Sequence, residues 1–150
     1  MTAWKRKWRQ VWVESKALNY LALARKASRV ELGEEPVGAA ARGQKARLII
    51  VASDATDHTW RRALSFVANT TQQCIRVPYT KEQLGEAIGR TSLAIAAFTD
   101  PALALAFVKA LPQQERYAEA LEDLTSRTKR VRQHRQEEKA HLRNKRKGKK

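Results

Sequence analysis

The sequence predicts an α/β fold in which helices cover both faces of a single sheet, a three-layer α/β/α sandwich. Short apolar runs of strand length alternate with helix-like segments between residues 17 and 112, which is typical of a sheet flanked by helices. Residues 47–52, RLIIVA, are almost continuously apolar, as expected for a central strand that is buried on both faces. Specific helix start signals also precede two of the helical segments.

The first elements are predicted in the order helix, strand, helix. Residues 14–28 place leucine and alanine at helical spacing, with basic residues on the more polar faces, so they predict the first core helix. A short strand-like piece then leads to Gly33. Residues 34–42 predict a second helix, with Pro36 tolerated in its first turn and Gly43 placed for a C-terminal cap.

Further helices and strands alternate after residues 47–52. Thr80 and Gln83 have the spacing of a capping box, and Asp100 followed by Pro101 is typical of an N-cap with proline at the first helical position. In chain order, the remaining predicted elements are a helix at residues 56–69, a strand at 74–77, a helix at 80–88, a strand at 93–98 and a helix at 102–111.

Positive charge is concentrated at the two ends of the chain. The net charge is +15, and residues 126–150 contain twelve Lys or Arg against two Glu. Such clusters raise the affinity for polyanions. We predict one folded domain at residues 17–112, a basic, Trp-bearing, helical N-terminal extension at 1–16, and a helical, basic C-terminal tail at 113–150 that is disordered past about Lys139.

Three tryptophans, Trp4, Trp8 and Trp12, recur every four residues among basic residues. On a helix this spacing places the indoles along one slowly drifting stripe. The stripe could pack against the domain or a protein partner, contact RNA, or lie on a membrane surface. The spacing leaves these alternatives open, with the membrane the least favoured.

The chain lacks the residue patterns of common catalytic and metal sites. Gly33 and Gly38 have the glycine spacing of a phosphate loop, but Ala39 and Ala40 stand where that loop needs Lys and then Ser or Thr. The three histidines have no metal-ligand spacing to a cysteine. We therefore predict no catalytic residue, no cofactor and no metal, and a protein that is not an enzyme.

A few reactive side chains remain, and structural roles explain them better than catalysis. Asp54, Asp57 and His58 follow a predicted strand, where capping and turn chemistry account for them. The single cysteine, Cys74, begins a predicted strand and should behave as a small hydrophobe without an internal disulfide. No apolar run approaches the roughly 18 to 20 residues of a membrane span, and we expect a cytoplasmic protein.

Three segments in order carry a family resemblance: LALARKASRVELGEE, KARLIIVASDAT and LGEAIGRTSLAIAAFTDP. Together they resemble the YlxQ-like bacterial branch of the kink-turn-binding ribosomal-protein family, the L-seven-Ae type. The resemblance covers roughly residues 18–111. It implies a small mixed sheet within the three-layer sandwich, and noncatalytic binding of structured RNA in a ribonucleoprotein. The implied partner is RNA, with ribosomal RNA as the expected class.

In that family, one edge binds RNA through the loop and helix start after the GEE-like glycine and through the loop that follows LGxAxG. The resemblance places the same edge here, with cations before the first side that could hold phosphate. The candidate residues are Arg25, Lys26, Arg29, Gly33, Glu34, Glu35, Gly89, Arg90, Thr91 and Ser92. Amides at a helix start, together with cations, can grip a phosphate backbone.

Three positions depart from the family pattern. Kink-turn binders of the family typically carry Asn, Glu and Lys where this chain has Glu35, Pro36 and Ala39. The Lys would contact phosphate, and the Glu would accept a hydrogen bond from a base. The departures therefore also support a second hypothesis, a protein-interaction adaptor that has lost kink-turn readout and docks partners through its tryptophan stripe.

Overall fold

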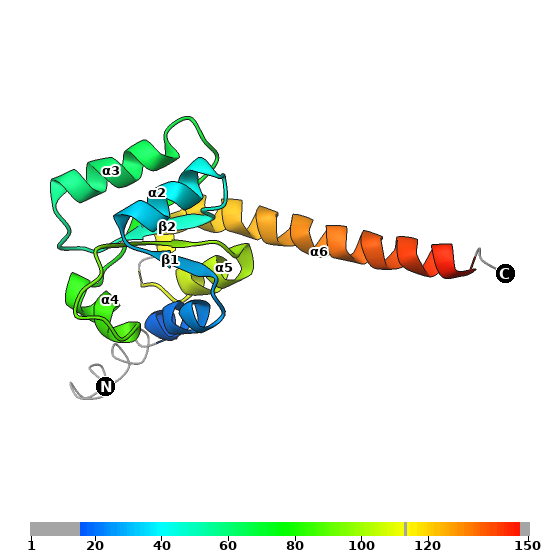
Figure 1. Ribbon diagram of the computed structural model, residues 1–150, viewed down its shortest axis with the longest axis horizontal. Coiled ribbons are helices and arrows are strands. Elements are labelled where there is room, and N and C mark those ends of the chain that lie inside the picture. The colour runs from blue at the N-terminus through cyan, green and yellow to red at the C-terminus, as the bar shows by residue number, and fades with distance from the viewer. Residues whose placement is uncertain (1–15, 113, 148–150) are drawn as a thin grey trace.

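A four-stranded sheet forms the centre of the molecule, and helices lie against it (Figure 1). The computed structural model describes residues 16–112 and 114–147. The predicted Trp-bearing extension at residues 1–16 lies outside the described residues, except for Lys16. Within the described ranges, no helix combines the length and the apolar composition needed to cross a membrane.

The sheet is small and mixed, as the family resemblance implies. Its strands are β1 (Val30–Leu32), β2 (Leu48–Val51), β3 (Gln73–Arg76) and β4 (Ile95–Phe98), in the spatial order β1-β4-β2-β3. Strand β4 runs antiparallel to β1 and β2, whereas β2 and β3 are parallel. Every residue of β2 and β4 is buried, which confirms the central strand that residues 47–52 predict.

Alternate residues of the central strands face two separate cores. Leu48 and Ile50 of β2 join the larger core, whereas Ile49 and Val51 join the smaller one. The larger core also contains residues of the first helix (residues 16–26), α4 (Lys81–Ala87), α5 (Pro101–Lys109) and α6 (Ala118–Lys147). The smaller core contains residues of α2 (Glu34–Arg42) and α3 (Asp57–Val67). Helices therefore cover both faces, which confirms the three-layer α/β/α sandwich.

The predicted helix start signals are largely present. The Thr80 hydroxyl accepts from the Gln83 amide, and the Gln83 side chain accepts from the Thr80 amide at 2.9 Å, so a complete capping box begins α4. Pro101 is the first residue of α5, as predicted. Asp100 is the N-cap residue of α5, but its side chain makes no capping hydrogen bond.

Two helices end in a way that the sequence does not predict. Gly43 caps α2 with an ordinary φ of −82°, and the left-handed residue is the next one, Gln44, with φ 58°. The first helix stops at Lys26, and Ser28 has φ 57°. After Ser28, the Arg29 amide donates to the Ala24 carbonyl, and after Gln44, the Lys45 amide donates to the Ala40 carbonyl. This is the Schellman arrangement. That hydrogen bond offsets the modest cost of a left-handed residue other than glycine.

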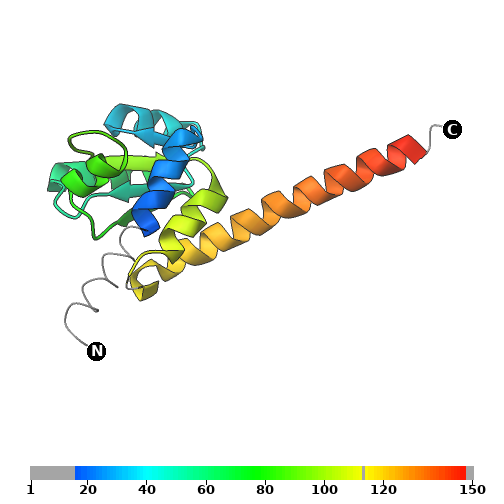
Figure 2. The same cartoon turned by 90° about the horizontal axis from the view of Figure 1, so that it is seen from below.

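The C-terminal segment is more regular than predicted. After a short 3-10 turn (Gln114–Tyr117), α6 continues as helix to Lys147, including the part past Lys139 that we expected to be disordered. Side-chain pairs four residues apart, such as His134 with Glu138 at 3.0 Å, support a helix here. Figure 2 shows α6 projecting away from the sheet, and every side chain at residues 129–145 is exposed.

The beginning of α6 belongs to the larger core. Tyr117, Ala120 and Leu124 are buried there, and Arg127 donates to the Thr71 carbonyl at 2.8 Å. The predicted domain boundary at residue 112 therefore does not separate the core from the tail.

Candidate nucleic-acid interface

Gly33 makes the turn between β1 and α2. Its φ is 94°, in the left-handed region that glycine adopts most readily. The Gly33 amide donates to the Ile95 carbonyl at 3.0 Å, which fixes this turn to the start of β4. No described side chain caps the start of α2, so the amides of Glu34 and Glu35 have no partner within the helix. Such amides can bind an anion.

Glu34 links α2 to α3. Its Oε1 atom lies 3.4 Å from Nε of Arg62, and both side chains are between a third and a half exposed. The same guanidinium lies over the Phe66 ring, 5.6 Å from the ring centre. An exposed pair of this kind contributes little to stability, about 0 to 1 kcal/mol. The Glu34 carboxylate is thus paired with Arg62, whereas the Glu35 side chain is exposed to solvent.

The second predicted side is the loop of residues 89–92 after α4. Gly89 has φ 74°, and the Arg90 amide bonds to the Gly85 carbonyl at 2.8 Å. A methyl group on Gly85 would lie 2.7 Å from the backbone of Ser92, so the loop crosses directly over Gly85. The side chains of Arg90, Thr91 and Ser92 are exposed, and they can reach a ligand.

The two predicted sides lie at the same end of the sheet. Strand β4 begins three residues after Ser92, at Ile95, which holds the Gly33 amide. Arg25 belongs to the second side, because its Nη1 atom lies 3.6 Å from the place that a Gly89 methyl group would take. We call the set of Arg25, Gly33, Glu34, Glu35, Gly89, Arg90, Thr91 and Ser92 the glycine edge. Lys26 is exposed next to Arg25 in the same helical turn.

Arg29 is separated from the rest of the predicted site. The Arg29 carbonyl accepts from the Thr99 amide, whereas Gly33 bonds to Ile95 at the opposite end of β1. Four strand residues at roughly 3.3 Å each place the two positions about 13 Å apart along the backbone. Arg29 instead lines a hollow with Arg132 and Arg135 of α6. The structure therefore does not bring Arg29 to the glycine edge.

The positions that depart from the family pattern are open to solvent. Glu35, Pro36 and Ala39 are exposed. They line a hollow of about 600 Å³ between α2 and α3, together with Arg42 and Arg62. Arg62 of α3, which pairs with Glu34, therefore lines the same hollow as Ala39, the position of the missing Lys. The sequence patterns indicate neither the pairing of Arg62 with Glu34 nor the contact of Gly85 with the loop above it, since both are contacts between separate segments.

The reactive groups outside the glycine edge have structural roles or are exposed. The Asp54 carboxylate accepts from the Lys81 amide at 2.8 Å, the capping role that we predicted. His58 is exposed. Burial raises the pKa of the Cys74 thiol to about 12, despite the opposing charge of Arg76, so the thiol is a poor nucleophile near neutral pH. Among the described residues, no group of three or more His, Cys, Asp or Glu is arranged to hold a metal ion.

Comparison with known proteins identifies a family and two similar structures. The sequence profile of the ribosomal protein L7Ae/L30e/S12e/Gadd45 family matches residues 15–105. No curated protein sequence matches the chain significantly. A solved structure of a protein with unknown function from Bacillus halodurans is 27% identical, with a TM-score of 0.59, and the match covers 63% of this chain and 95% of that one.

A second solved structure is similar in fold. It is the 15.5kD RNA binding protein of Giardia lamblia, which is 18% identical, with a TM-score of 0.54. The match covers 69% of this chain and 88% of that chain. At this identity the likeness concerns the arrangement of helices and strands alone.

Proposed function

The chain belongs to the ribosomal protein L7Ae/L30e/S12e/Gadd45 family, and on this premise we propose that it is a noncatalytic RNA-binding protein that binds structured RNA through the glycine edge. One observation carries the proposal. Two loops that begin at left-handed glycines, Gly33 and Gly89, lie at one end of the sheet with the cation Arg25 beside the second. Helix-start amides and cations placed together suit a folded phosphate backbone.

We also propose a branch of the family, a class of RNA and the bounds of the RNA-binding domain. We propose that the chain belongs to the YlxQ-like bacterial branch of the family, on the three sequence segments that carry the resemblance. We propose ribosomal RNA, bound in the cytoplasm, as the class of ligand. Residues 17–112 would form the RNA-binding domain, with the start of α6 completing its core, and with the N-terminal segment at 1–16 and the rest of the tail at 113–150 as extensions.

Kink-turn recognition would need a different set of contacts from the usual one. Pro36 and Ala39 have no side-chain group that can accept from a base or hold phosphate. In this proposal, Arg62 and Arg42 beside the hollow take the place of the missing Lys, and Glu35 provides an exposed acceptor for a base amino group.

The test is a double charge reversal, Arg25→Glu with Arg90→Glu, in the full chain. Binding to a labelled kink-turn RNA and to a perfect RNA duplex of equal length is measured by fluorescence anisotropy. We expect the variant to lose its preference for the kink-turn RNA, because two edge cations become repulsive. Lys45→Glu with Arg61→Glu, at exposed positions elsewhere on the core, is the matched control and should keep the preference. A preference that survives in the edge variant contradicts the proposal.

The second candidate is the protein-interaction adaptor. Ala39 and Pro36 on the exposed face of α2 favour it, because they leave that face poor in groups that read bases. Its docking element would be the stripe of Trp4, Trp8 and Trp12, which lies outside the described residues. Affinity purification with and without nuclease separates the two functions. An RNA-binding protein should lose its co-purifying proteins after nuclease treatment, whereas an adaptor should keep them.

A further inference from the structure

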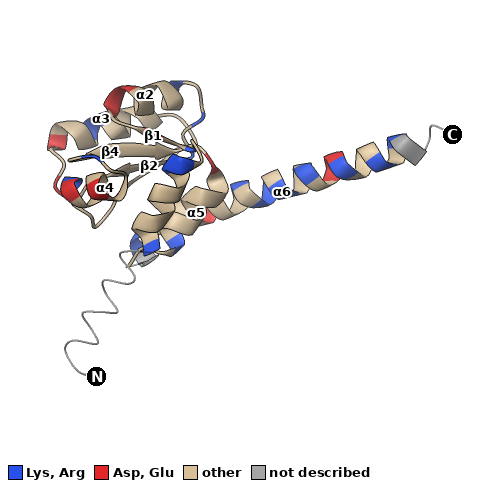
Figure 3. Ribbon diagram, turned by 60° about the horizontal axis from the view of Figure 1, so that its bottom comes forward, with Lys and Arg blue, Asp and Glu red and all other residues tan. Residues whose placement is uncertain are grey.

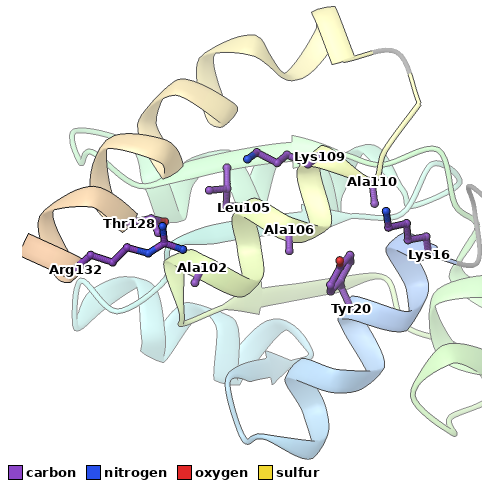
Figure 4. Close-up of a pocket in the computed structure, with 9 residues that line it drawn as sticks. All are labelled: Lys16, Tyr20, Ala102, Leu105, Ala106, Lys109, Ala110, Thr128 and Arg132. Carbon is purple, nitrogen blue, oxygen red and sulfur yellow. The ribbon is translucent and has the colours of Figure 1, made fainter. Parts of the chain in front are cut away.

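A groove runs between the first helix, α5 and α6, away from the glycine edge. It consists of two adjoining hollows of about 320 Å³ and 160 Å³, which share Ala102, Thr128 and Arg132. Figure 4 shows the larger one, with side chains from all three helices around it. We call this surface the basic groove.

Cations from four parts of the chain line the basic groove. They are Lys16 of the first helix, Arg29 before β1, Lys109 of α5, and Arg132 and Arg135 of α6. All five are exposed. Asp100 is the one acidic residue among those that line the two hollows. The groove therefore has a strong positive potential, which favours a polyanionic ligand.

The floor of the basic groove is apolar. It is made by Ala102, Leu105, Ala106 and Ala110 on one side of α5. The partly buried ring of Tyr20 lies beside Ala106 (Figure 4). A paired duplex presents phosphates and groove edges and keeps its base faces stacked inside. An unpaired strand can lay its bases and sugars on an apolar and aromatic floor while cations on the rim hold its phosphates.

From this combination we propose that the basic groove binds a single-stranded segment of RNA. The phosphates lie along Lys16, Arg132, Arg135 and Arg29, and one base stacks on Tyr20. The groove shares no residue with the glycine edge, so this inference goes beyond the proposed function and concerns a separate surface. A protein with both surfaces holds a structured RNA element and an unpaired strand at the same time.

The test uses a fluorescein-labelled uridine 12-mer and the full chain, with affinity measured by anisotropy at several salt concentrations. Arg132→Glu with Arg135→Glu should weaken binding at least about tenfold. The salt slope should also flatten by roughly 1.4, at about 0.7 for each phosphate no longer neutralised in a single strand. Both residues are exposed, so the variant should fold, and circular dichroism checks this.

The chain offers a matched control on the same helix. Lys129→Glu with Arg130→Glu makes the same change in net charge at exposed positions that do not line the groove. We expect a loss of less than about threefold for this pair. Equal losses for the two pairs would show that only the total charge of α6 matters, and would overturn the proposal.

Two further variants test the groove independently of α6. Asp100→Asn removes the opposing charge and keeps a residue suited to an N-cap, so it should strengthen binding by about twofold. Tyr20→Leu keeps an apolar side chain but removes the stacking surface, and should weaken binding about fivefold or more. A 12-mer that contains 4-thiouridine should crosslink to the peptide that carries Tyr20. If neither variant changes the affinity, or a duplex of the same length competes equally well, the proposal is wrong.

These measurements can contradict the groove proposal and the glycine-edge proposal independently of each other. The glycine-edge variant, Arg25→Glu with Arg90→Glu, should lose less than about threefold in affinity for the uridine 12-mer, as the control pair on α6 does. If it loses that binding while the groove variants keep it, the single strand binds at the glycine edge, and the groove proposal is overturned. If the groove variants behave as expected and the kink-turn preference survives in the edge variant, only the proposed function is wrong.

Discussion

Gly85 is a position where a single methyl group should reshape the candidate interface. Its added Cβ would lie 2.7 Å from the Cα and N atoms of Ser92 and 2.9 Å from the Arg90 carbonyl oxygen. The neighbours are backbone atoms, so the loop itself must move. We expect Gly85→Ala to lower the free energy of unfolding by about 1 to 3 kcal/mol and to weaken RNA binding. Chemical denaturation and anisotropy measure the two effects.

Gly43 provides the control for that substitution. It has φ −82°, and an added Cβ would meet its nearest atom, the Ala39 carbonyl oxygen, at 3.6 Å. Gly43→Ala should therefore be tolerated, or should raise the free energy of unfolding by about 0.4 to 1 kcal/mol by restricting the unfolded chain. If both variants bind RNA equally well, the loop position is not set by Gly85.

The Cys74 thiol should make the free energy of unfolding decrease with pH in the alkaline range. Burial raises its pKa from an ordinary value of 9.0 to about 12. Well below pH 9 the thiol is protonated in both the folded and the unfolded state. Between about pH 9 and 12 the unfolded chain loses this proton while the folded chain keeps it, so the free energy of unfolding falls as the pH rises. Denaturation at pH 8 and pH 10.5 should show a smaller decrease for Cys74→Ala than for the unmodified chain. Equal decreases would contradict a buried neutral thiol.

Single residues of the candidate site were predictable where local backbone geometry decides their role. Gly33 directly precedes a predicted helix start, and the family resemblance places Gly89 in the second loop; both have positive φ. The positions of the cations were less predictable. Arg25 and Arg29 are four residues apart, yet only Arg25 lies beside Gly89, because β1 carries the chain from Arg29 to the other end of the sheet. Strand direction and length, rather than spacing in the sequence, decide this difference.

At the scale of elements, helix starts were predictable and two helix ends were not. Thr80 and Gln83 form their capping box because both partners are local side chains with fixed spacing. The ends at Ser28 and Gln44 are closed by backbone hydrogen bonds, from the Arg29 amide to the Ala24 carbonyl and from the Lys45 amide to the Ala40 carbonyl, which need no particular side chain. Side-chain preference alone favours glycine at such positions. A glycine near the helix end is not a sufficient signal either, because Gly43 ends α2 with an ordinary φ of −82° and the left-handed residue is Gln44.

Helix α6 combines a core-forming part and an exposed part, and the two should respond differently to truncation of a side chain. Leu124 is fully buried in the larger core, whereas Val131 is 38% exposed two turns later. Leu124→Ala should lower the free energy of unfolding by about 2 to 5 kcal/mol. Val131→Ala should change it by no more than about 0.5 kcal/mol. Urea denaturation measures both, and a large effect at Val131 would mean that α6 packs against the core further along its length.

At the scale of the whole molecule, the tail should determine how strongly RNA binding depends on salt. Figure 3 shows basic residues repeated along α6. Deleting residues 136–150 removes seven Lys or Arg and two Glu and leaves Arg132 and Arg135 in the basic groove. We expect the slope of log affinity against log salt to flatten by several units, at about 0.7 to 0.9 per neutralised phosphate. Anisotropy titrations across a salt series measure it.

A full-length variant separates charge from length in that experiment. Replacing Lys139, Arg143 and Lys145 with Gln keeps the helix and removes three exposed cations. This variant should flatten the slope of log affinity against log salt by up to about 2 to 3, less than the deletion does. An unchanged slope in both variants would exclude the tail from contact with the RNA backbone.

The three-layer architecture was predictable because it depends on a repeated pattern. Apolar runs of strand length alternate with helical segments, and such a chain has few ways to bury both. The extent of the core was not predicted. Tyr117, Ala120 and Leu124 follow helical spacing within an otherwise polar segment, and a pattern this short does not show which surface covers it. Helix α6 packs against α5 and β3, which only the folded molecule brings alongside.

The length of α6 has a kinetic consequence for a polyanionic partner. Thirty residues at 1.5 Å each give a rod of about 45 Å, and its exposed half holds cations well beyond the roughly 8 Å over which salt screens a charge at physiological ionic strength. Encounters that would miss the compact body are attracted by the rod, which widens the target for diffusion. We therefore expect the outer half of α6 to govern how fast a partner is captured, and the surfaces near the sheet to set the residence time.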